Sequence, residues 1–271
     1  MRLSGTVFSN TLEKDTGITI ITPNNLLKQK QYKVAYVLHG LCGNNKTWLD
    51  YSMLSVYAME GNTIYILPDA ERSFYCNQYF DYITEELPLI CKNIFSISSH
   101  REDTIILGSS MGGYGALLCA LSKPQQYGIC GAFSSCCLFL KQGLYDMKQN
   151  SIKYQQQFGK QLLNDFTSIF GESLIWKPEF DILEKAKKAK KQNIFLVDKT
   201  IFIKEWWDNK DDVTLITRPR RFGKTLTLSM IEQFFSVNHA GSDIFQDMDI
   251  WKDKQYQQLQ GKYPVIALSF S

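Results

Sequence analysis

The stretch that decides the fold runs from Thr104 to Leu121 and reads T-I-I-L-G-S-S-M-G-G-Y-G-A-L-L-C-A-L. Its first four residues are apolar or β-branched and predict a short buried strand. A G-x-S-x-G turn follows from Gly108 to Gly112, and Ala116–Leu121 continue as strong helix formers. A strand, a sharp glycine-flanked turn and a helix are the context of a nucleophile elbow. We therefore interpret Ser110 as a candidate nucleophile at the tip of this turn.

The glycines on either side of Ser110 let the chain reverse tightly and let the helix pack closely on the strand. Such a turn exposes the Ser110 hydroxyl. The N–H of Met111, at the helix N-terminus, then points toward an oxyanion that develops beside it. The alternative interpretation is a glycine-rich strand-to-helix turn without chemistry. The flanking strand and helix favour the elbow.

Composition places the chain among globular proteins and excludes several function classes. Its 271 residues, of which 44% are hydrophobic, can form one large domain or two small ones. A net charge of +3 gives no sign of a nucleic-acid partner. The seven cysteines include no C-x-x-C pair, so we expect neither a metal site nor a disulfide framework. The lack of a leader-like segment and of a long apolar run predicts a cytoplasmic protein without a membrane partner.

A second glycine-rich loop follows the predicted strand Tyr32–Leu38. It reads H-G-L-C-G-N-N-K-T-W, from His39 to Trp48. In hydrolases with a nucleophile elbow, a loop at this place supplies the second oxyanion donor, which here is the N–H of Leu41. His39 stands beside this loop and could be interpreted as a catalytic base. We favour a histidine that orients the loop by hydrogen bonding.

The rest of the first part alternates strands with helices, which predicts a mostly parallel, doubly wound α/β sheet. The other predicted strands are Leu3–Ser9, Gly17–Thr22, Thr63–Leu67 and Tyr127–Ser135.

A helix is predicted over Phe80–Phe95, with a kink at Pro88. Its apolar residues recur at helical spacing and predict one face that covers the sheet. They are Ile83, Leu87, Ile90 and Ile94.

Residues 1 to about 192 resemble the esterase D-type branch of the α/β-hydrolases, which includes tributyrin-esterase-like, feruloyl-esterase-like and S-formylglutathione-hydrolase-like enzymes. The matching pieces are Y-V-L-H-G-L-C-G-N-N-K-T-W, I-L-P-D, S-F-Y, L-G-S-S-M-G-G-Y-G-A, G-A-F-S-S and I-F-G-E-S-L. The resemblance implies Ser110 as the nucleophile and the N–H groups of Leu41 and Met111 as the oxyanion hole. It also implies small acyl esters as substrates, with no cofactor.

We place His39, Trp48 and Tyr75 in the predicted substrate cleft. Tyr75 belongs to the aromatic loop E-R-S-F-Y-C-N, from Glu71 to Asn77. This loop either lines the cleft or packs as an ordinary loop, and its residues leave both possibilities open.

The chain departs from this family in its catalytic triad. A serine esterase needs an imidazole to accept the serine proton and a carboxylate to orient that imidazole. In this fold both follow the elbow, first the acid and then the histidine. Of the three histidines, His39 and His100 precede Ser110, and only His239 follows it. We therefore expect an esterase domain that is truncated before its acid and histidine loops, with impaired turnover.

Residues Asn193 to Ser271 resemble the front part of the AAA-ATPase-like proteins, which carry a T-R-P-R-R-F-G-K-[ST] loop. The loop ends here in Gly223, Lys224 and Thr225 at the start of a predicted helix, which is the arrangement of a phosphate cradle. In that arrangement Lys224 reaches the β- and γ-phosphates of ATP, and Thr225 holds Mg²⁺.

Arg218 stands where a standard phosphate-binding loop has its first glycine, and it is expected to add a phosphate contact. The alternative is a basic loop that bounds a surface helix. After this loop no apolar strand ends in Asp or Glu, so we expect the second fragment to stop before its catalytic half.

Sequence order alone permits a rebuilt triad of Ser110, Asp198 and His239. The predicted helix Lys224–Val237 carries the chain roughly 20 Å, at about 1.5 Å per residue, so His239 should emerge far from Ser110. Asp198 is as readily interpreted as the cap of the following helix. We disfavour the rebuilt triad.

The sequence thus predicts two incomplete enzymes joined near Gln192. The first is a truncated α/β-hydrolase domain over residues 1–192, and the second is the N-terminal fragment of a P-loop-like α/β domain over residues 193–271. The strands expected at Asn193–Val197 and Val213–Thr217 could extend the first sheet. Three function classes stay open: a serine ester hydrolase, a nucleotide-binding module and a catalytically dead fusion product.

Overall fold

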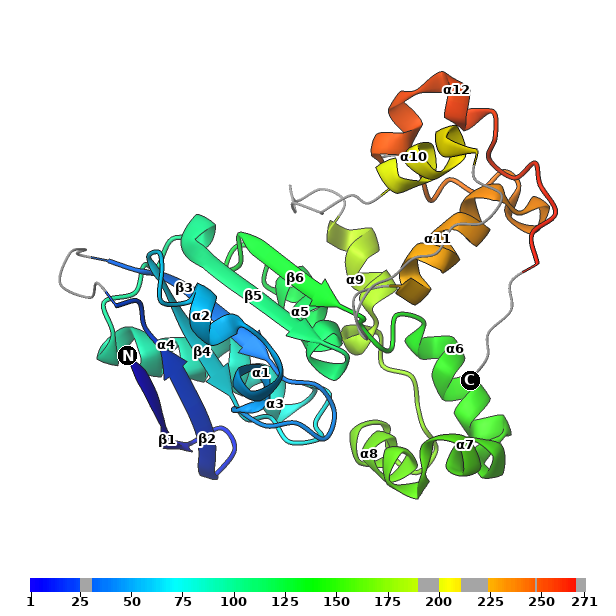
Figure 1. Cartoon of the computed structure of the whole chain (residues 1–271). Helices are drawn as coiled ribbons and strands as arrows, with labels where there is room; N and C mark the ends of the chain where they lie inside the picture. The colour runs from blue at the N-terminus through cyan, green and yellow to red at the C-terminus, as the bar shows by residue number, and fades with distance from the viewer. Residues whose placement is uncertain (25–30, 190–199, 211–223, 247, 267–271) are drawn as a thin grey trace. The chain divides into compact units, whose positions relative to one another are not determined.

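Figure 1 shows the computed structural model of the chain, which describes residues 1–24, 31–189, 200–210, 224–246 and 248–266. The chain divides into two compact units, Met1–Phe195 and Leu196–Ser271, and each is described by itself. The strands predicted at Asn193–Val197 and Val213–Thr217 lie outside the described residues. The same holds for Asp198, Arg218 and Gly223.

The first unit is built on a six-stranded sheet with the strand order β1-β2-β4-β3-β5-β6. The strands are β1 (Arg2–Ser9), β2 (Lys14–Ile21), β3 (Lys33–Leu38), β4 (Thr63–Pro68), β5 (Thr104–Ser109) and β6 (Ile129–Phe133). Strands β4, β3, β5 and β6 pair in parallel, and β1 and β2 add an antiparallel hairpin at one edge. The predicted mostly parallel α/β sheet is confirmed.

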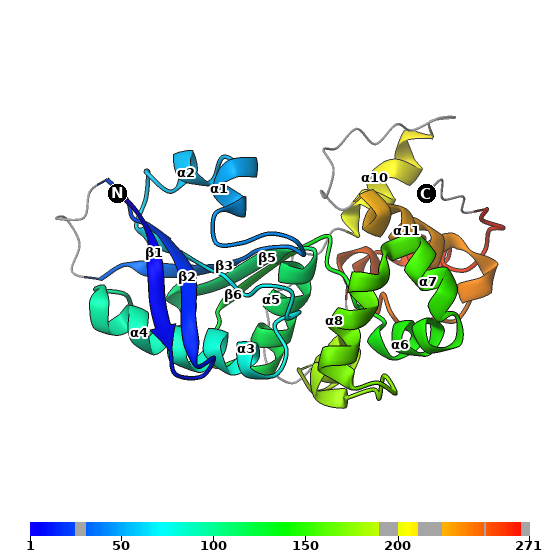
Figure 2. The same ribbon diagram turned by 90° about the horizontal axis from the view of Figure 1, so that it is seen from below.

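Helices cover both faces of this sheet (Figure 2). Because successive side chains of a strand point to opposite faces, β3 contributes to two separate apolar clusters. Val34, Tyr36 and Leu38 join the main core beneath α4 (Leu87–Ile94) and α5 (Met111–Ser122). The residues between them, Ala35 and Val37, pack with α1 (Thr47–Tyr51) and α2 (Leu54–Tyr57).

A π-helical turn divides the helix that was predicted over Phe80–Phe95. The chain runs through α3 (Gln78–Asp81), a π-helix at Tyr82–Glu86 and then α4. Pro88 has no N–H to donate to the carbonyl of Thr84, four residues earlier. The side-chain amide of Gln126 donates to that carbonyl instead, at 2.9 Å. The kink predicted at Pro88 is therefore a wider helical turn whose free carbonyl is satisfied from outside the helix.

The residues that this segment buries differ in part from the predicted ones. Ile83 and Leu87 lie in the core as predicted, whereas Ile94 is 63% exposed. Cys91 is buried in its stead. Leu87 and Ile94 both follow the π-helical turn and share one face of α4, and Ile94 is the last residue of that helix.

Helices follow β6 to the end of the first unit. They are α6 (Leu140–Gln149), α7 (Ser151–Phe158), α8 (Lys160–Phe170) and α9 (Ile182–Ala189), with a 3₁₀ turn at Pro178–Phe180 before α9. The Phe166 ring on α8 lies 4.8 Å from that of Phe74, in the loop after β4. The aromatic loop predicted at Glu71–Asn77 is thereby packed against α8.

The second unit has a small helical core of its own. Its helices are α10 (Ile201–Asn209), α11 (Lys224–Phe235) and α12 (Lys254–Gln257), with 3₁₀ turns at Val237–His239 and Asp249–Lys252. Near the end of the described residues, Tyr263 forms an isolated bridge with Ser236. Among the described residues of both units, none of the helices has the length and apolarity needed to cross a membrane.

Candidate active site

Ser110 occupies a strained turn between β5 and α5. Its backbone has φ 58° and ψ −116°, a region that side-chain-bearing residues rarely enter. Such strain costs about 1–3 kcal/mol and persists only where the surroundings enforce it. Here the Ser110 N–H donates to the Phe133 carbonyl at 2.9 Å, and the Ser110 carbonyl accepts from Tyr114 N–H at 3.0 Å. Strand β6 and the first turn of α5 therefore hold Ser110 in place.

Gly112 allows α5 to begin directly against the end of β3. A Cβ atom at this position would lie only 2.2 Å from the Leu38 carbonyl oxygen and 2.7 Å from that of His39. Real Cβ atoms do not approach a backbone oxygen so closely, so only glycine fits here. The second glycine of the G-x-S-x-G motif thus sets the distance between the serine turn and the loop that follows β3.

That loop lies beside Ser110. A Cβ atom on Gly40 would come 3.5 Å from the Ser110 Cβ and 3.2 Å from the Ser109 carbonyl oxygen. Among the described residues, the backbone N–H groups of Leu41 and Met111 donate to no acceptor. Unused donors in the residue after a half-exposed serine and in the loop beside it can stabilise an oxyanion that develops there.

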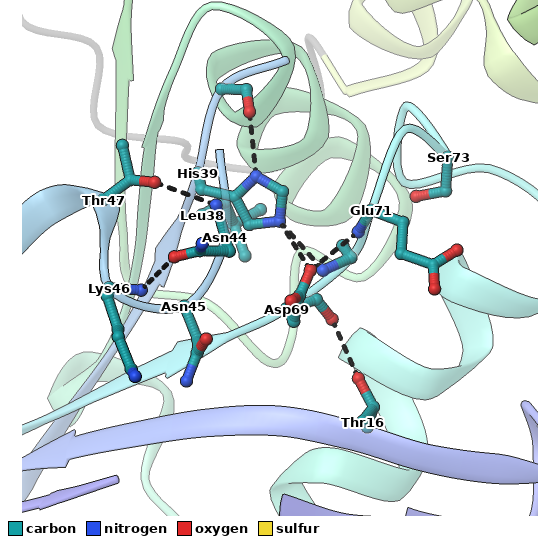
Figure 3. A network of polar contacts seen from close by, with 12 residues as sticks. Thr16, Leu38, His39, Asn44, Asn45, Lys46, Thr47, Asp69, Glu71 and Ser73 are labelled. Carbon is teal, nitrogen blue, oxygen red and sulfur yellow. Dashed lines mark hydrogen bonds and ion pairs between the residues drawn. The ribbon is translucent and has the colours of Figure 1, made fainter. Parts of the chain in front are cut away.

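His39 is buried beneath this loop and holds it in shape (Figure 3). Its Nε2 accepts a hydrogen bond from the Ala70 N–H at 2.9 Å, so Nδ1 carries the proton. That Nδ1–H donates to the Gly40 carbonyl at 2.8 Å. Both ring nitrogens are thus engaged by backbone, which matches the interpretation of His39 as a residue that orients the loop.

Asp69 supports the same network from the end of β4 (Figure 3). Its Oδ1 lies 3.4 Å from His39 Nε2 and accepts from the Glu71 N–H at 2.9 Å. Burial raises the pKa of Asp69, whereas the hydrogen bond from the Glu71 N–H and the nearby charge of Lys14 lower it, and the net shift is downward. The carboxylate therefore stays charged and fixes the turn that presents Ala70 N–H to His39.

The three residues predicted for the substrate cleft have different places in the structure. Tyr75 is fully buried, with 0% exposure, and its hydroxyl donates to the His39 carbonyl at 2.9 Å. His39 is buried as well. Trp48 is half-buried, and its indole N–H donates to the Leu38 carbonyl at 2.9 Å. These side chains shape the loop after β3 from within, so Tyr75 and His39 do not line an open cleft.

An ion pair that sequence reasoning missed ties this region to α8. The Arg72 guanidinium donates to both oxygens of Asp165, with the shortest N–O distance 2.6 Å, and Asp165 is 6% exposed. Arg72 Nη1 also lies 2.9 Å from the Sγ of Cys42, in the loop after β3. The two partners are 93 residues apart, and no local motif in the sequence indicates that they pair.

Histidines of the described part of the first unit offer no base to Ser110. His39 uses both ring nitrogens for backbone contacts. His100 precedes β5, whereas Ser110 follows it, and a six-residue strand separates its ends by about 20 Å. His239 belongs to the second unit, where its Nε2 lies 3.1 Å from Gln233 Nε2. Lys224 and Thr225 begin α11 in that unit, and their side chains lie outside the described part of the chain.

A mostly parallel sheet with a strained serine between a parallel strand and the following helix defines the class of the α/β-hydrolase-type serine hydrolases. The chain belongs to the esterase family whose model bears the description "Putative esterase", which matches residues 9–216. The predicted resemblance is thereby confirmed at the level of the family.

Similar proteins agree with this assignment. An acetyl esterase from Caldicellulosiruptor saccharolyticus is 29% identical over 178 residues, which are 60% of this chain and 67% of that relative. The S-formylglutathione hydrolase FrmB from Staphylococcus aureus has 25% identity and a TM-score of 0.57, over 77% of this chain and 85% of that one. The fluorophosphonate-binding serine hydrolase FphF from the same organism shares the fold, with a TM-score of 0.58 at 23% identity over 85% of this chain and 96% of that one.

A second family model, "Predicted AAA-ATPase", matches residues 183–271. This match covers the second unit and overlaps the esterase match from 183 to 216. The overlap of the two matches includes Gln192, near which the sequence predicts the junction of the two parts.

Proposed function

We propose that the chain is a serine carboxylic-ester hydrolase in which Ser110 forms an acyl-enzyme with short acyl groups. The observation that carries this proposal is the strained turn at Ser110, with unused N–H donors at Met111, the next residue, and at Leu41, in the neighbouring loop. The name of the acetyl-esterase relative supports a small acyl group.

In the proposed reaction the Ser110 hydroxyl oxygen attacks the ester carbonyl carbon. The carbonyl oxygen becomes an oxyanion, which the N–H groups of Leu41 and Met111 stabilise. The tetrahedral intermediate expels the alcohol, leaving the acyl group on Ser110, and water later releases it as the carboxylic acid. Because no histidine of the described first unit lies next to Ser110, the proton of Ser110 passes to solvent and each step is slow.

The direct test is acylation of the full-length protein by p-nitrophenyl acetate. We expect a burst of one p-nitrophenol per chain, followed by slow turnover, with the acetyl group on the peptide that contains Ser110. An oxyanion hole and binding alone leave roughly 10³–10⁴-fold rate enhancement in a serine protease without its triad. A folded protein that releases p-nitrophenol no faster than buffer contradicts the proposal.

His239→Ala is the matched control for this test, because the proposal gives His239 no part in the reaction. The variant should show the same burst and the same turnover as the native sequence. A general base contributes at least about a hundredfold, so a drop of that size would assign His239 the role of base.

The match to the AAA-ATPase-like model favours nucleotide binding as a second candidate function. We propose that Lys224, at the start of α11, contacts the phosphates of ATP, with Thr225 as a ligand of Mg²⁺. Addition of ATP and Mg²⁺ should then raise the melting temperature of the full-length protein, and Lys224→Ala should remove that rise. Lys254→Ala, an exposed lysine at the start of α12, should retain it. Equal shifts in both variants, or none in the native protein, contradict this candidate.

A further inference from the structure

Two adjacent cysteines, Cys136 and Cys137, form a thiol pair just after β6. Adjacent residues of a regular strand point to opposite faces, so their thiols are normally apart. Cys137 instead has a left-handed backbone with φ 55°, which breaks this alternation. The neighbouring Cys136 thiol, together with burial, raises the pKa of Cys137. Both residues are half-buried, and neither is in a disulfide.

The backbone that carries the thiol pair contacts the Ser110 turn. The Cys136 N–H donates to the Ser110 carbonyl at 3.3 Å. A Cβ atom on Gly113 would lie 3.1 Å from the Ser135 Cα, so the segment before the pair touches the first turn of α5. A change in the backbone at Cys136 therefore reaches the strained residue that carries the proposed nucleophile.

We propose that Cys136 and Cys137 are a bidentate site for trivalent, thiophilic arsenicals, and that occupation of this site slows acylation of Ser110. The second half of the proposal rests on the proposed function, whereas the first half does not.

The chemistry balances without an oxidant. An organoarsenic(III) oxide reacts with two thiols: both S–H bonds break, two As–S bonds form, and the oxo oxygen leaves as water with both protons. Arsenic stays trivalent. Neutral thiols suffice, which fits a cysteine whose thiol is held protonated. The second As–S bond forms within the same chain. Free thiols should therefore compete for the arsenic about 10²-fold or more less effectively than they do when it is held by one As–S bond.

The probe is phenylarsine oxide, added to the full-length protein with excess 2-mercaptoethanol and followed by intact mass. We expect one phenylarsenic group per chain, released by ethanedithiol. Digestion of the labelled native protein should locate the group on the peptide that contains Cys136 and Cys137. Cys136→Ser and Cys137→Ser should each lose the group, while Cys42→Ser, which removes an exposed thiol elsewhere, should keep it.

Cys76 is the main alternative partner for the arsenic, because it is close enough to interact electrostatically with both members of the pair. A group that survives Cys136→Ser but disappears in Cys76→Ser would place the arsenic between Cys76 and Cys137 and overturn the proposed site. A group found on another peptide, or none on the native protein, would also overturn it. Peptide mapping of the native protein decides this even if a variant does not fold.

The effect on Ser110 is measured as the rate of labelling by an organophosphonate with and without bound arsenic. A misplacement of 1 Å can cost about a hundredfold, so we expect slowing by about tenfold to a hundredfold, reversed by ethanedithiol. An arsenic-loaded protein that is labelled at the native rate would disprove the coupling. If the native protein is never labelled on Ser110, the proposed function fails, and the mass measurement still tests the dithiol site.

Discussion

Replacing Ser110 with alanine should abolish labelling of the full-length protein by an organophosphonate probe. The probe reports an activated hydroxyl: the serine oxygen attacks phosphorus, the leaving group departs, and the phosphoryl oxygen is stabilised by nearby donors. Only Ser110 combines a half-exposed hydroxyl with the unused N–H groups of Met111 and Leu41 within the described first unit. Mass spectrometry of the labelled peptides measures the result.

Two further variants make this result specific. Ser109→Ala removes the neighbouring hydroxyl from the end of β5, where the backbone is that of an ordinary strand, and labelling should persist. Ser110→Gly should lose labelling like Ser110→Ala and yet be at least as stable as the native protein, because glycine adopts φ 58° without strain. An adduct on any residue other than Ser110, or an adduct that survives Ser110→Ala, would refute the assignment.

Gly112→Ala should strongly destabilise the first unit, although it adds only one methyl group. The new Cβ would lie 2.2 Å from the Leu38 carbonyl oxygen and 2.6 Å from the Leu38 carbonyl carbon. Strand β3 is paired on both sides, with β4 and with β5, so its backbone cannot move aside without loss of both ladders. Overpacking of a core typically lowers the free energy of unfolding by about 1–3 kcal/mol. Because the contact here is with a rigid strand, we expect Gly112→Ala to cost at least the upper end of that range.

The matched control is Gly143→Ala, in the middle of α6, where a Cβ would meet nothing within 4 Å. Alanine in a helix interior is favoured over glycine by up to about 1 kcal/mol, so this variant should be neutral or slightly more stable. Thermal unfolding of both variants gives the comparison. If Gly112→Ala unfolds at the native temperature, α5 does not begin as close to β3 as the structure indicates.

Some features of this protein could be predicted because their signals are local. The strand, the glycine-flanked serine and the helix are consecutive residues, so the motif could be recognised from the sequence although the Ser110 backbone is strained. The same holds for the loop from His39 to Trp48, where a histidine beside a glycine-rich turn indicated a hydrogen bond that orients the loop. The helix start at Lys224 was also predicted, while the role of its side chain stays a prediction.

Other expectations failed because distant residues decided them. Tyr75 was expected at a cleft, but its ring fills the space left by Gly115 and its hydroxyl reaches the His39 carbonyl, so the aromatic loop packs inward. Ile94 was expected in the core, but it is the last residue of α4 and is 63% exposed, and a π-helical turn stands before Pro88. That turn is tolerated because Gln126, 42 residues away from Thr84, satisfies the free carbonyl.

The sequence by itself determined the class of fold, the family and the residue at the tip of the elbow, since strand, turn and helix propensities act over a few neighbouring positions. Only the tertiary structure decided how that residue is held. The Phe133 carbonyl and the Cys136 N–H reach Ser110 from β6 and the segment after it, and Arg72 joins the loop at Cys42 to a carboxylate on α8. These contacts join residues that are far apart along the chain, and no sequence motif links them. They form only once the sheet has brought the ends of its parallel strands to one edge.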